Sequence, residues 1–447
     1  MAEQLTLKML SDAVADSGCA FRSRVELEPA GGEGTEVFPP TYAGAVYATE
    51  KRRLKGREEP VECVLLDSVQ SQANRMEEAL QQAVDAGRIK IPIVEVDFDP
   101  YFPDDRKEMC LLDRVGKVSS LQAPHRIADA ILRESLLQGK PFRESELGKR
   151  IGMVSARDAT ALFELCPTAL VFGLWDSTGP KGGLGAKFER AIVSEIVGID
   201  AVYGVKTSSR IDPSIQKNPP LFETPKGDWT ALESEAARVP LKAKKDERTE
   251  QDAGESPAGY QESAKSDKKD APKKYPKKLS ELNLGNVTPD LKDKKGQAYP
   301  GGVTITHAEQ TVVLSLLALR RLRFPLNGKH DIDVDNAART VLAALGLCAA
   351  ALSAENGLDL RSRCLLWPIK PLEWELLAGS GEITKVSLGA KQAIELLQKA
   401  VAAAKKLHLT WREEPLVLTP SPKLVKLVVR SQNLAVEQGG ASAEGDE

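Results

Sequence analysis

The sequence predicts a core of the α+β or α/β class, because strand-like and helix-like segments alternate along most of its 447 residues. Residues 61–67 (VECVLLD) form a continuous apolar run typical of a buried strand, and residues 68–87 follow with helical periodicity and end in glycine. Residues 91–98 alternate in the manner of a strand, and residues 126–137 place apolar side chains on one helical face. Such repeated β-α-β units argue against a helical bundle or a β-sandwich.

The segment 168–210 carries the most informative local pattern. We expect a buried strand, a glycine-rich loop, an amphipathic helix and a second strand whose end carries Lys206 and Arg210. Residues 303–324 are expected to begin as a short strand and continue as a buried helix. The remaining predicted elements are an alanine-rich helix at 336–354, a strand near 361–367, a helix at 390–406 and short strands at 415–419 and 423–429.

One change in composition divides the chain. Residues 223–300 are rich in Lys, Asp, Glu, Ser and Pro and poor in large apolar side chains, so burial cannot offset the entropy of ordering them. We therefore expect a charged, mobile insertion between a core segment at 1–222 and the elements at 301–434 that complete the core. Residues 435–447 are expected to form a flexible tail.

Net charge, cysteine spacing and the length of apolar runs exclude some classes of protein. The formal net charge of -3 and the pI of about 6.0 count against a general nucleic-acid binder, so a nucleic-acid site requires segregated basic residues. The six cysteines include no C-x-x-C pair, which indicates reduced core thiols in a cytoplasmic protein rather than a metal site or a disulfide framework. No run approaches the roughly 18 apolar residues of a membrane span, so we expect a soluble protein with no membrane contact.

The glycine-rich loop has the composition of a phosphate cradle. Glycines let backbone N–H groups approach an anion closely, and nearby cations supply formal charge. The residues of this kind are Gly179, Lys181, Gly182, Gly183, Gly185, Lys187 and Arg190. The spacing excludes both a Walker P-loop and a G-x-G-x-x-G motif, because Ala186 precedes Lys187 and Phe188 occupies the place of the next required residue. A plain flexible connection is the alternative.

The segment 67–78 follows a predicted strand, opens a predicted helix and is unusually rich in amides. Amides, hydroxyls and arginine hydrogen-bond phosphates and 2′-hydroxyls without sequence preference. The candidate contacts are Ser71, Gln72, Asn74 and Arg75. Alternatively, Asp67 or Ser68 caps the helix and the amides face water.

A basic cluster at Lys51, Arg52 and Arg53 follows a strand-like segment that contains Tyr42 and Tyr47. Dense cations beside aromatic side chains are the composition of a single-strand binding surface, where phosphate neutralisation combines with base stacking. The tip of a charged hairpin would have the same composition.

Catalysis has little support in the sequence. The four histidines lie far apart, and none has a second ligand at metal spacing, so we expect no metal and no cofactor. His125 lies near a predicted helix start and is the candidate general base of an RNA-cleaving enzyme. A capping or phosphate-contacting histidine is the favoured interpretation, and the predicted set of catalytic residues is empty.

Several long segments in order carry a resemblance to one family. They are FPPTYAGAVYATEKR, CVLLDSVQSQANRMEEAL, APHRIADAILRES and FGLWDSTGPKGGLGAKFERAIVSEIVGIDA. Together they resemble the backbone RAMP protein of the CRISPR type I-U effector complex, also called type I-G. The resemblance extends over roughly residues 20–215 and more loosely through the predicted helices of 303–353.

This resemblance implies an RRM-like, ferredoxin-like palm with large insertions that form fingers and thumb, and a helical C-terminal part. It implies a non-catalytic subunit of Cascade that polymerises along the spacer of a CRISPR guide RNA (crRNA) for antiviral defence. In such assemblies base pairing reads the target DNA while the protein holds the RNA backbone. The implied partners are the guide RNA, target DNA through the guide, other copies of the chain, other Cascade subunits and the effector nuclease-helicase.

Carried onto this sequence, the resemblance assigns RNA contacts to the strand–helix junction and to the glycine loop. It also assigns them to the cluster at 51–53, as a groove-lining or thumb-like loop, and to further basic residues. The complete set is Lys51, Arg52, Arg53, Ser71, Gln72, Asn74, Arg75, His125, Arg126, Lys181, Gly182, Gly183, Lys187, Lys206 and Arg210.

Two other functions remain open on the sequence. The first is a RAMP endoribonuclease that processes CRISPR RNA, with His125 as its base. The second is a nucleotide-binding enzyme that uses the glycine loop, although the missing lysine–hydroxyl pair argues against it.

Overall fold

The computed structural model describes residues 2–44, 46–101, 115–179, 185–205, 208–210, 212–215, 218–239, 271–272, 279–282, 284–285, 287–292, 296, 298 and 300–439. The chain forms two compact units. The first comprises 1–204 and 302–434, and the second comprises 205–301 and 435–447.

The α-helices of the described residues are, in chain order, α1 Leu7–Ala15, α2 Val69–Asp85, α3 Ala130–Arg133, α4 Glu146–Met153, α5 Thr160–Leu165, α6 Thr168–Phe172, α7 Leu316–Arg320, α8 Ile332–Glu355, α9 Ala390–Lys406 and α10 Pro422–Gly439. Short 3-10 turns include η3 Arg126–Ala128 and η4 Phe142–Glu144.

Three sets of strands belong to the first unit. The main sheet contains β1 Glu3–Gln4, β2 Gly18–Pro29, β5 Thr49–Arg52, β6 Val61–Asp67, β13 Ile192–Ile199, β22 His307–Ser315, β23 Leu358–Asp359, β24 Leu365–Pro368, β25 Trp374–Ala378 and β26 Ile383–Ser387. A smaller sheet contains β7 Val94–Asp97, β8 Lys117–Ser119 and β27 Leu416–Leu418. Two-stranded pairs are β3 Thr41–Tyr42 with β4 Val46–Tyr47, β9 Leu136–Leu137 with β10 Lys140–Pro141, and β11 Leu174–Trp175 with β12 Lys187–Phe188.

Within the described residues, the main sheet has the strand order β1-β26-β25-β2-β22-β13-β6-β5, with β24 also paired to β2 and β23 to β24. The elements β2, α2, β13, β22, α8 and β25 follow one another as β-α-β-β-α-β. In the sheet the four strands lie in the order β25-β2-β22-β13. Numbered by their place in this β-α-β-β-α-β unit, the order is 4-1-3-2, which is the ferredoxin-like arrangement. The predicted α+β class is therefore confirmed, and the β5–β6 hairpin is an addition at the edge of this core.

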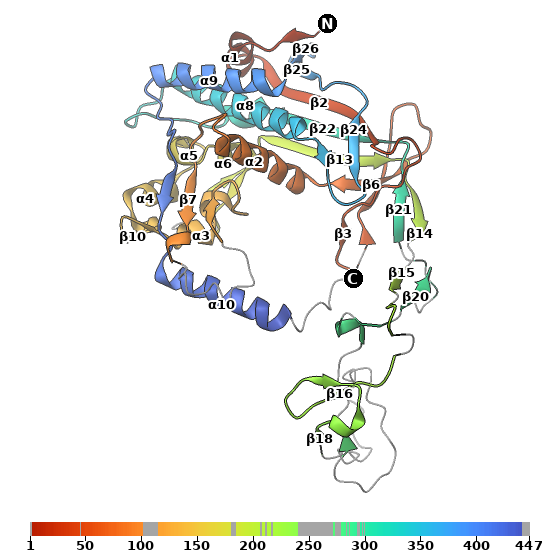
Figure 1. Cartoon of the computed structure of the whole chain (residues 1–447). Helices are drawn as coiled ribbons and strands as arrows, with labels where there is room; N and C mark the ends of the chain where they lie inside the picture. Colours follow the sequence, from red (N-terminus) through yellow and green to blue (C-terminus); the bar gives the residue numbers. More distant parts are fainter. Residues whose placement is uncertain are drawn as a thin grey trace, which may run out of the picture. The chain divides into compact units, whose positions relative to one another are not determined.

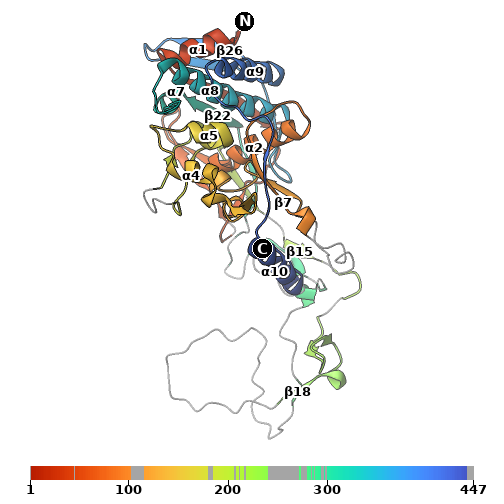
Figure 2. The ribbon, with the colours of Figure 1, turned by 90° about the vertical axis from the view of Figure 1, so that its left-hand side faces the viewer.

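One face of the sheet is covered by α2, α8 and α9 (Figure 1). Successive side chains of a strand point to opposite faces of the sheet. Every second side chain of the central strands therefore points to the covered face and is buried there, including Phe21, Ile196 and Leu314. Helix α8 runs along α9 in both views (Figures 1 and 2) and is almost entirely buried. By length and hydropathy alone α8 could cross a membrane, but 83% of its most apolar window is buried inside the protein, as in a core helix.

The segment around the glycine loop differs from the prediction. Residues 168–172 form the buried helix α6 instead of a strand, and residues 192–199 form the central strand β13 instead of a helix. A short apolar run cannot be assigned by periodicity alone, since a buried helix and a buried strand both hide every side chain. In β13 the β-branched residues Ile192, Val193, Ile196, Val197 and Ile199 favour the extended backbone.

Three other predicted elements are wrong in type or extent. Residues 307–315 form strand β22 before the short helix α7, and residues 423–429 lie in helix α10 instead of a strand. The predicted helix at 126–137 is broken into η3, α3 and β9. The structure confirms strand β6, helices α2, α8 and α9, and strands β24 and β27 close to their predicted bounds.

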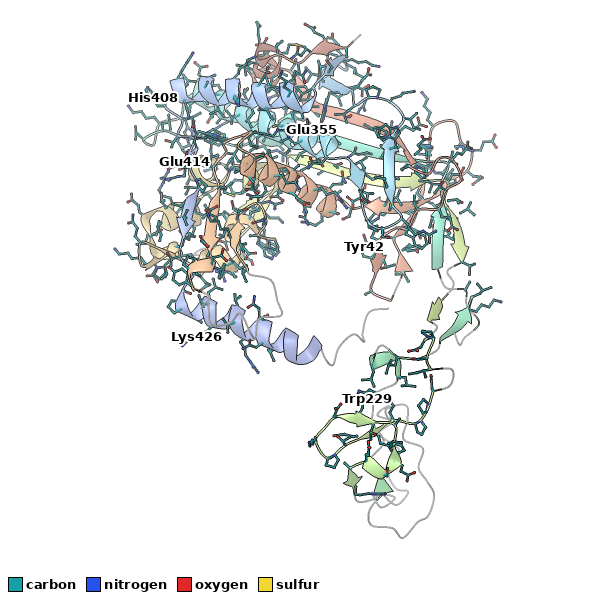
Figure 3. All side chains as sticks on the ribbon, viewed as in Figure 1. Tyr42, Trp229, Glu355, His408, Glu414 and Lys426 are labelled. Carbon is teal, nitrogen blue, oxygen red and sulfur yellow. The ribbon has the colours of Figure 1, made fainter. Side chains whose placement is uncertain are left out.

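The second unit contains small antiparallel pairs among its described residues. They are β15 Ser208–Arg210 with β20 Val287–Asp290, β16 Phe222–Glu223 with β17 Trp229–Thr230, and β18 Arg238–Val239 with β19 Ala271–Pro272. Figure 3 labels Trp229 in this unit. Residues 240–270 are the longest stretch of the predicted insertion that lies outside the described residues, and the mobility of 223–300 stays a prediction.

Candidate nucleic-acid interface

The start of α2 sits on a buried polar network at the end of β6. Gln72 donates from Nε2 to Asp67 Oδ2 at 2.6 Å, and its Oε1 accepts from Ser194 Oγ at 2.8 Å and Gln310 Nε2 at 2.9 Å. Gln72 is only 1% exposed. The prediction that Gln72 contacts RNA is therefore wrong, because this side chain is buried and its amide joins α2 to β6, β13 and β22.

Arg75 is also held by protein groups. Its Nε donates to Asp67 Oδ2 at 2.9 Å and its Nη2 to the Leu360 carbonyl oxygen at 2.7 Å. Arg361 places a second guanidinium 3.4 Å from the same carboxylate, which balances the charge that β6 buries. The guanidinium of Arg75 thus ties α2 to the segment before β24, and its prediction as an RNA contact is untested.

The exposed side of the same helix start carries Gln70 and Asn74, which hydrogen-bond to each other at 3.2 Å. Ser71 is half-buried, and its N–H donates to the capping hydroxyl of Ser68 at 3.2 Å. Ser68 is therefore the N-cap, as the alternative interpretation expected, while Asn74 remains available to a ligand.

Arg126 has a structural role that the sequence did not suggest. It is 6% exposed, and its Nε and Nη2 each lie 2.7 Å from the carboxylate of Glu77. Its Nη1 donates to the Gly173 carbonyl oxygen at 2.9 Å, and its guanidinium lies 5.7 Å from the ring centre of Phe172. The predicted RNA contact at Arg126 is wrong, because this side chain is buried as a bidentate ion pair.

Burial raises the pKa of the Glu77 carboxyl above its usual range, and the hydrogen bonds and charge of Arg126 oppose this shift. Arg126 also adopts a positive φ of 50°, an uncommon conformation for a side chain with a Cβ. The ion pair therefore holds a turn of the backbone that packs α2 against the connection between α6 and β11.

His125, directly before this turn, is exposed, and its side chain makes no capping hydrogen bond. Its backbone N–H donates to Asp129 Oδ2 at 3.2 Å. The described residues contain no group of three or more His, Cys, Asp or Glu arranged to hold a metal ion.

The glycine loop is carried by a short hairpin of β11 and β12. Leu174 pairs with Phe188 and Trp175 pairs with Lys187. Leu174 and Phe188 are buried, whereas Trp175 is 62% exposed and Lys187 is exposed beside it. Lys181, Gly182 and Gly183 lie outside the described residues, so their predicted contacts are neither supported nor contradicted.

The N-terminal base of this loop is held by two arginines. Arg143 Nη2 lies 3.0 Å and 3.1 Å from the two carboxylate oxygens of Asp176. Asp176 Oδ1 also accepts the backbone N–H of Thr178 at 3.1 Å, and Arg133 donates to the hydroxyl of Thr178. The loop therefore leaves the body of the protein from a fixed, cation-rich base.

Arg190 joins the hairpin to the start of α2 by donating to Gln70 Oε1. The structure thus brings together exposed side chains that are 120 residues apart in the chain. We call this the hairpin surface, and it comprises Gln70, Asn74, Trp175, Lys187 and Arg190. Sequence reasoning left Gln70, a member of the amide-rich segment, out of the candidate contacts and missed Trp175, although a tryptophan shortly before a glycine-rich loop was a usable signal.

The basic cluster at 51–53 lies elsewhere in the fold. Lys51 and Arg52 belong to edge strand β5 and Arg53 directly follows it, and Arg52 pairs with Val61 at the far end of β6 from Asp67. At about 3.3 Å per residue, the length of β6 separates this pair from the start of α2 by roughly 20 Å. Arg52 is ion-paired to Glu50 and Glu195, whereas Lys51 and Arg53 are exposed.

Lysine on an edge strand also discourages unwanted strand pairing, so this cluster has a structural explanation. Tyr42, which is labelled in Figure 3, is exposed in the neighbouring β3–β4 hairpin. Lys206 lies outside the described residues. Arg210 ends β15 of the second unit, and its predicted contact stays a prediction.

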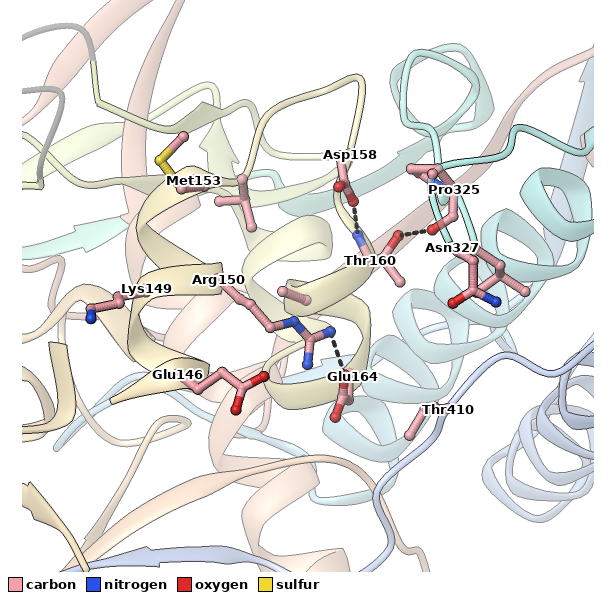
Figure 4. Close-up of a pocket in the computed structure, with 14 residues that line it drawn as sticks. Glu146, Lys149, Arg150, Met153, Asp158, Thr160, Glu164, Pro325, Asn327 and Thr410 are labelled. Carbon is pink, nitrogen blue, oxygen red and sulfur yellow. Dashed lines mark hydrogen bonds and ion pairs between the residues drawn. The ribbon is translucent and has the colours of Figure 1, made fainter. Parts of the chain in front are cut away.

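Two hollows lie near α4. The larger, of about 600 Å³, is shown in Figure 4, where some of its polar groups hydrogen-bond to one another. Arg150 donates to Glu164 at 2.8 Å, and Thr160 donates to the Pro325 carbonyl oxygen at 3.2 Å. The smaller, of about 340 Å³, has an apolar lining that includes Phe142 and reaches Arg143 and Asp176 at the loop base.

The ferredoxin-like sheet and its covering helices define an α+β protein. The hairpin surface, with its two exposed cations, is a candidate site for an anionic polymer. Residues 21–203 match the family model described as CRISPR-associated protein GSU0053. This match supports a CRISPR-associated protein and includes both β6–α2 and the β11–β12 hairpin. No curated protein matches the chain.

Proposed function

We propose that this chain is a non-catalytic, guide-RNA-binding backbone subunit of a type I-U (I-G) Cascade complex. Several copies line the spacer of one crRNA, hold its phosphates and leave its bases free to pair with target DNA. Other Cascade subunits and the effector nuclease-helicase supply the remaining functions. The match to a CRISPR-associated family supports this proposal, together with the exposed and cationic hairpin surface inside the matched region.

The chemistry of the hairpin surface suits an RNA backbone. Lys187 and Arg190 provide charge for phosphates, and Gln70 and Asn74 provide amides for 2′-hydroxyls and phosphate oxygens. Trp175 offers an aromatic face on which any base stacks, which is independent of sequence. The overall charge of -3 is compatible with this role, since these cations are concentrated on one small surface.

The test is to co-express the chain with a CRISPR array and the neighbouring effector genes, and to sequence the RNA that copurifies. Discrete spacer-containing RNA in a multi-copy particle is the expected result. A nucleic-acid-free monomer, from cells that made the guide and partner subunits, would contradict the proposal.

A second experiment tests the surface. Replacing Lys187 and Arg190 by alanine should weaken binding similarly for unrelated RNA sequences and lower the salt-dependence slope by about one to two units. The matched control replaces Lys391 and Lys399, two exposed cations of α9, and should leave the slope unchanged. Loss of binding to one RNA sequence alone would contradict recognition of the backbone.

The endoribonuclease alternative rests on the exposure of His125. His125→Ala should then abolish processing of a CRISPR RNA repeat and retain binding, while the exposed control His330→Ala remains active. Under the backbone proposal, wild type and both variants bind the guide without cleaving it.

A further inference from the structure

An exposed apolar stripe runs along β24. Leu365 and Trp367 flank the buried Leu366 in β24, and Ile369 follows the strand two residues after Trp367. The three side chains therefore share one face by the two-residue period of extended backbone, and Trp367 is 63% exposed. This is the face of the sheet opposite to α2, α8 and α9, because Leu366 between them lies in the buried core. Exposed apolar residues that lie together, rather than scattered singly, are a mark of interaction surfaces.

Each apolar residue of the stripe has an acidic neighbour. Asp359 lies directly opposite Leu365, and Glu28 lies directly opposite Trp367. The backbone N–H of Ile369 donates to the carbonyl oxygen of Glu26, which places a third acid beside the stripe. Within the part of the chain that the structure describes, none of these three carboxylates takes part in an ion pair.

We call the six residues the β24 patch: Glu26, Glu28, Asp359, Leu365, Trp367 and Ile369. Its three acids outnumber the adjacent Lys370, so the patch repels the phosphates of RNA. A protein surface that is both apolar and cationic is its complement.

Helix α10 has a surface of that kind. Leu424 is buried, and Val428 packs against the main core, so these residues form the attached side of the helix. Lys423, Lys426 and Arg430 are spaced by three and four residues and therefore share the opposite, exposed side. Figure 3 labels Lys426 on this helix.

Leu427, at 65% exposure, lies among these three cations. The sequence 422–434 contains no acidic residue, so the exposed side of α10 is cationic around an apolar centre. The ribbons of α10 and β24 lie at separate places in Figure 1, so we consider a contact between these surfaces from two different chains.

We propose that the β24 patch binds α10 of a second copy of this chain. The contact joins two different surfaces, so each copy offers one of each, and the copies form a head-to-tail series. The proposal rests on the proposed function in one respect, which is that several copies of the chain bind one guide RNA. The contact between the copies is made by protein groups alone. It identifies the surfaces through which adjacent copies touch.

Charge exchange between the two surfaces tests this contact. One variant carries Glu28→Lys with Asp359→Lys, and the other carries Lys423→Glu with Lys426→Glu. Each variant alone should weaken the association of full-length copies about tenfold by sedimentation, because like charges then face each other. An equimolar mixture of the two should restore association, since each then presents the complement of the other's altered surface. The α9 control, Lys391→Glu with Lys399→Glu, should associate as the wild type does.

Trp367→Ser provides a test that does not depend on charge, and it should weaken association by a similar factor. Circular dichroism and thermal unfolding of each variant check that the fold is retained. A mixture that associates no better than the separate variants would overturn the proposal.

Binding of each variant to an RNA too short for two copies distinguishes this proposal from the proposed function. If the α10 variant loses this binding and associates normally without RNA, α10 is an RNA contact and the proposal is wrong. If wild type associates through these surfaces and binds no guide RNA, the proposed function fails and this proposal stands.

Discussion

Replacing Arg126 by alanine tests whether this residue is structural. Its guanidinium makes two 2.7 Å hydrogen bonds to the buried carboxylate of Glu77 and a third, at 2.9 Å, to a backbone carbonyl oxygen. Removing one partner of a buried ion pair leaves the other charge uncompensated, which costs about 3–5 kcal/mol of unfolding free energy. We expect a loss of that size in urea unfolding, with the affinity of the remaining folded protein for RNA unchanged.

Two further variants test whether the loss of stability comes from the uncompensated charge of Glu77 or from the loss of an arginine in general. Arg88→Ala breaks an ion pair to Glu355 in which both side chains are more than 40% exposed, and it should leave the urea unfolding curve close to that of the wild type, because water screens an exposed pair. Adding Glu77→Met to Arg126→Ala should recover most of the loss, because no carboxylate is then left buried alone.

The pH dependence gives an independent check. Burial already raises the pKa of Glu77 in the native protein, and loss of Arg126 removes the interaction that opposes the shift. A folded state with a raised carboxyl pKa binds a proton that the unfolded state releases, so its stability falls as the pH rises through that pKa. The deficit of Arg126→Ala relative to wild type should therefore shrink as the pH is lowered from about 8 to 5. A variant of unchanged stability that loses RNA affinity would refute the structural role.

The other predictions concern single sites. Gln72→Ala should lower the unfolding free energy by about 2–4 kcal/mol, since it leaves two buried donors unpaired, whereas Asn74→Ala should leave stability within about 0.5 kcal/mol and weaken RNA binding. Burial raises the pKa of the Cys364 thiol to about 11, so a thiol reagent near neutral pH should label the partly exposed Cys19 first and reach Cys364 only after unfolding. Equal labelling rates would contradict the packing. Gly148→Ala should reduce soluble yield and melting temperature, because its Cβ would lie 1.8 Å from a backbone carbonyl oxygen. A variant with wild-type melting would show that the turn at η4 can open.

Two predicted RNA contacts are buried instead, for a common reason. Gln72 and Arg126 have the residue types of RNA contacts, and both are polar side chains whose partners come from distant parts of the sequence. A polar side chain in one sequence cannot be assigned to solvent or to a buried network until those partners are known. The burial of Glu77, beside its exposed neighbour Glu78, illustrates the same ambiguity for carboxylates.

The sequence alone determined the α+β class, the positions of α2, α8 and α9, and a glycine-rich loop beside cations, because propensity and periodicity are properties of neighbouring residues. Only the tertiary structure decided that 192–199 and 307–315 are adjacent central strands, since their pairing buries runs that periodicity leaves ambiguous. It also decided that Arg190 meets Gln70 to form one hairpin surface, and that Arg126 faces Glu77 inside the fold. These contacts join residues tens to hundreds of positions apart, and the free energy that selects them comes from packing and burial across the whole sheet.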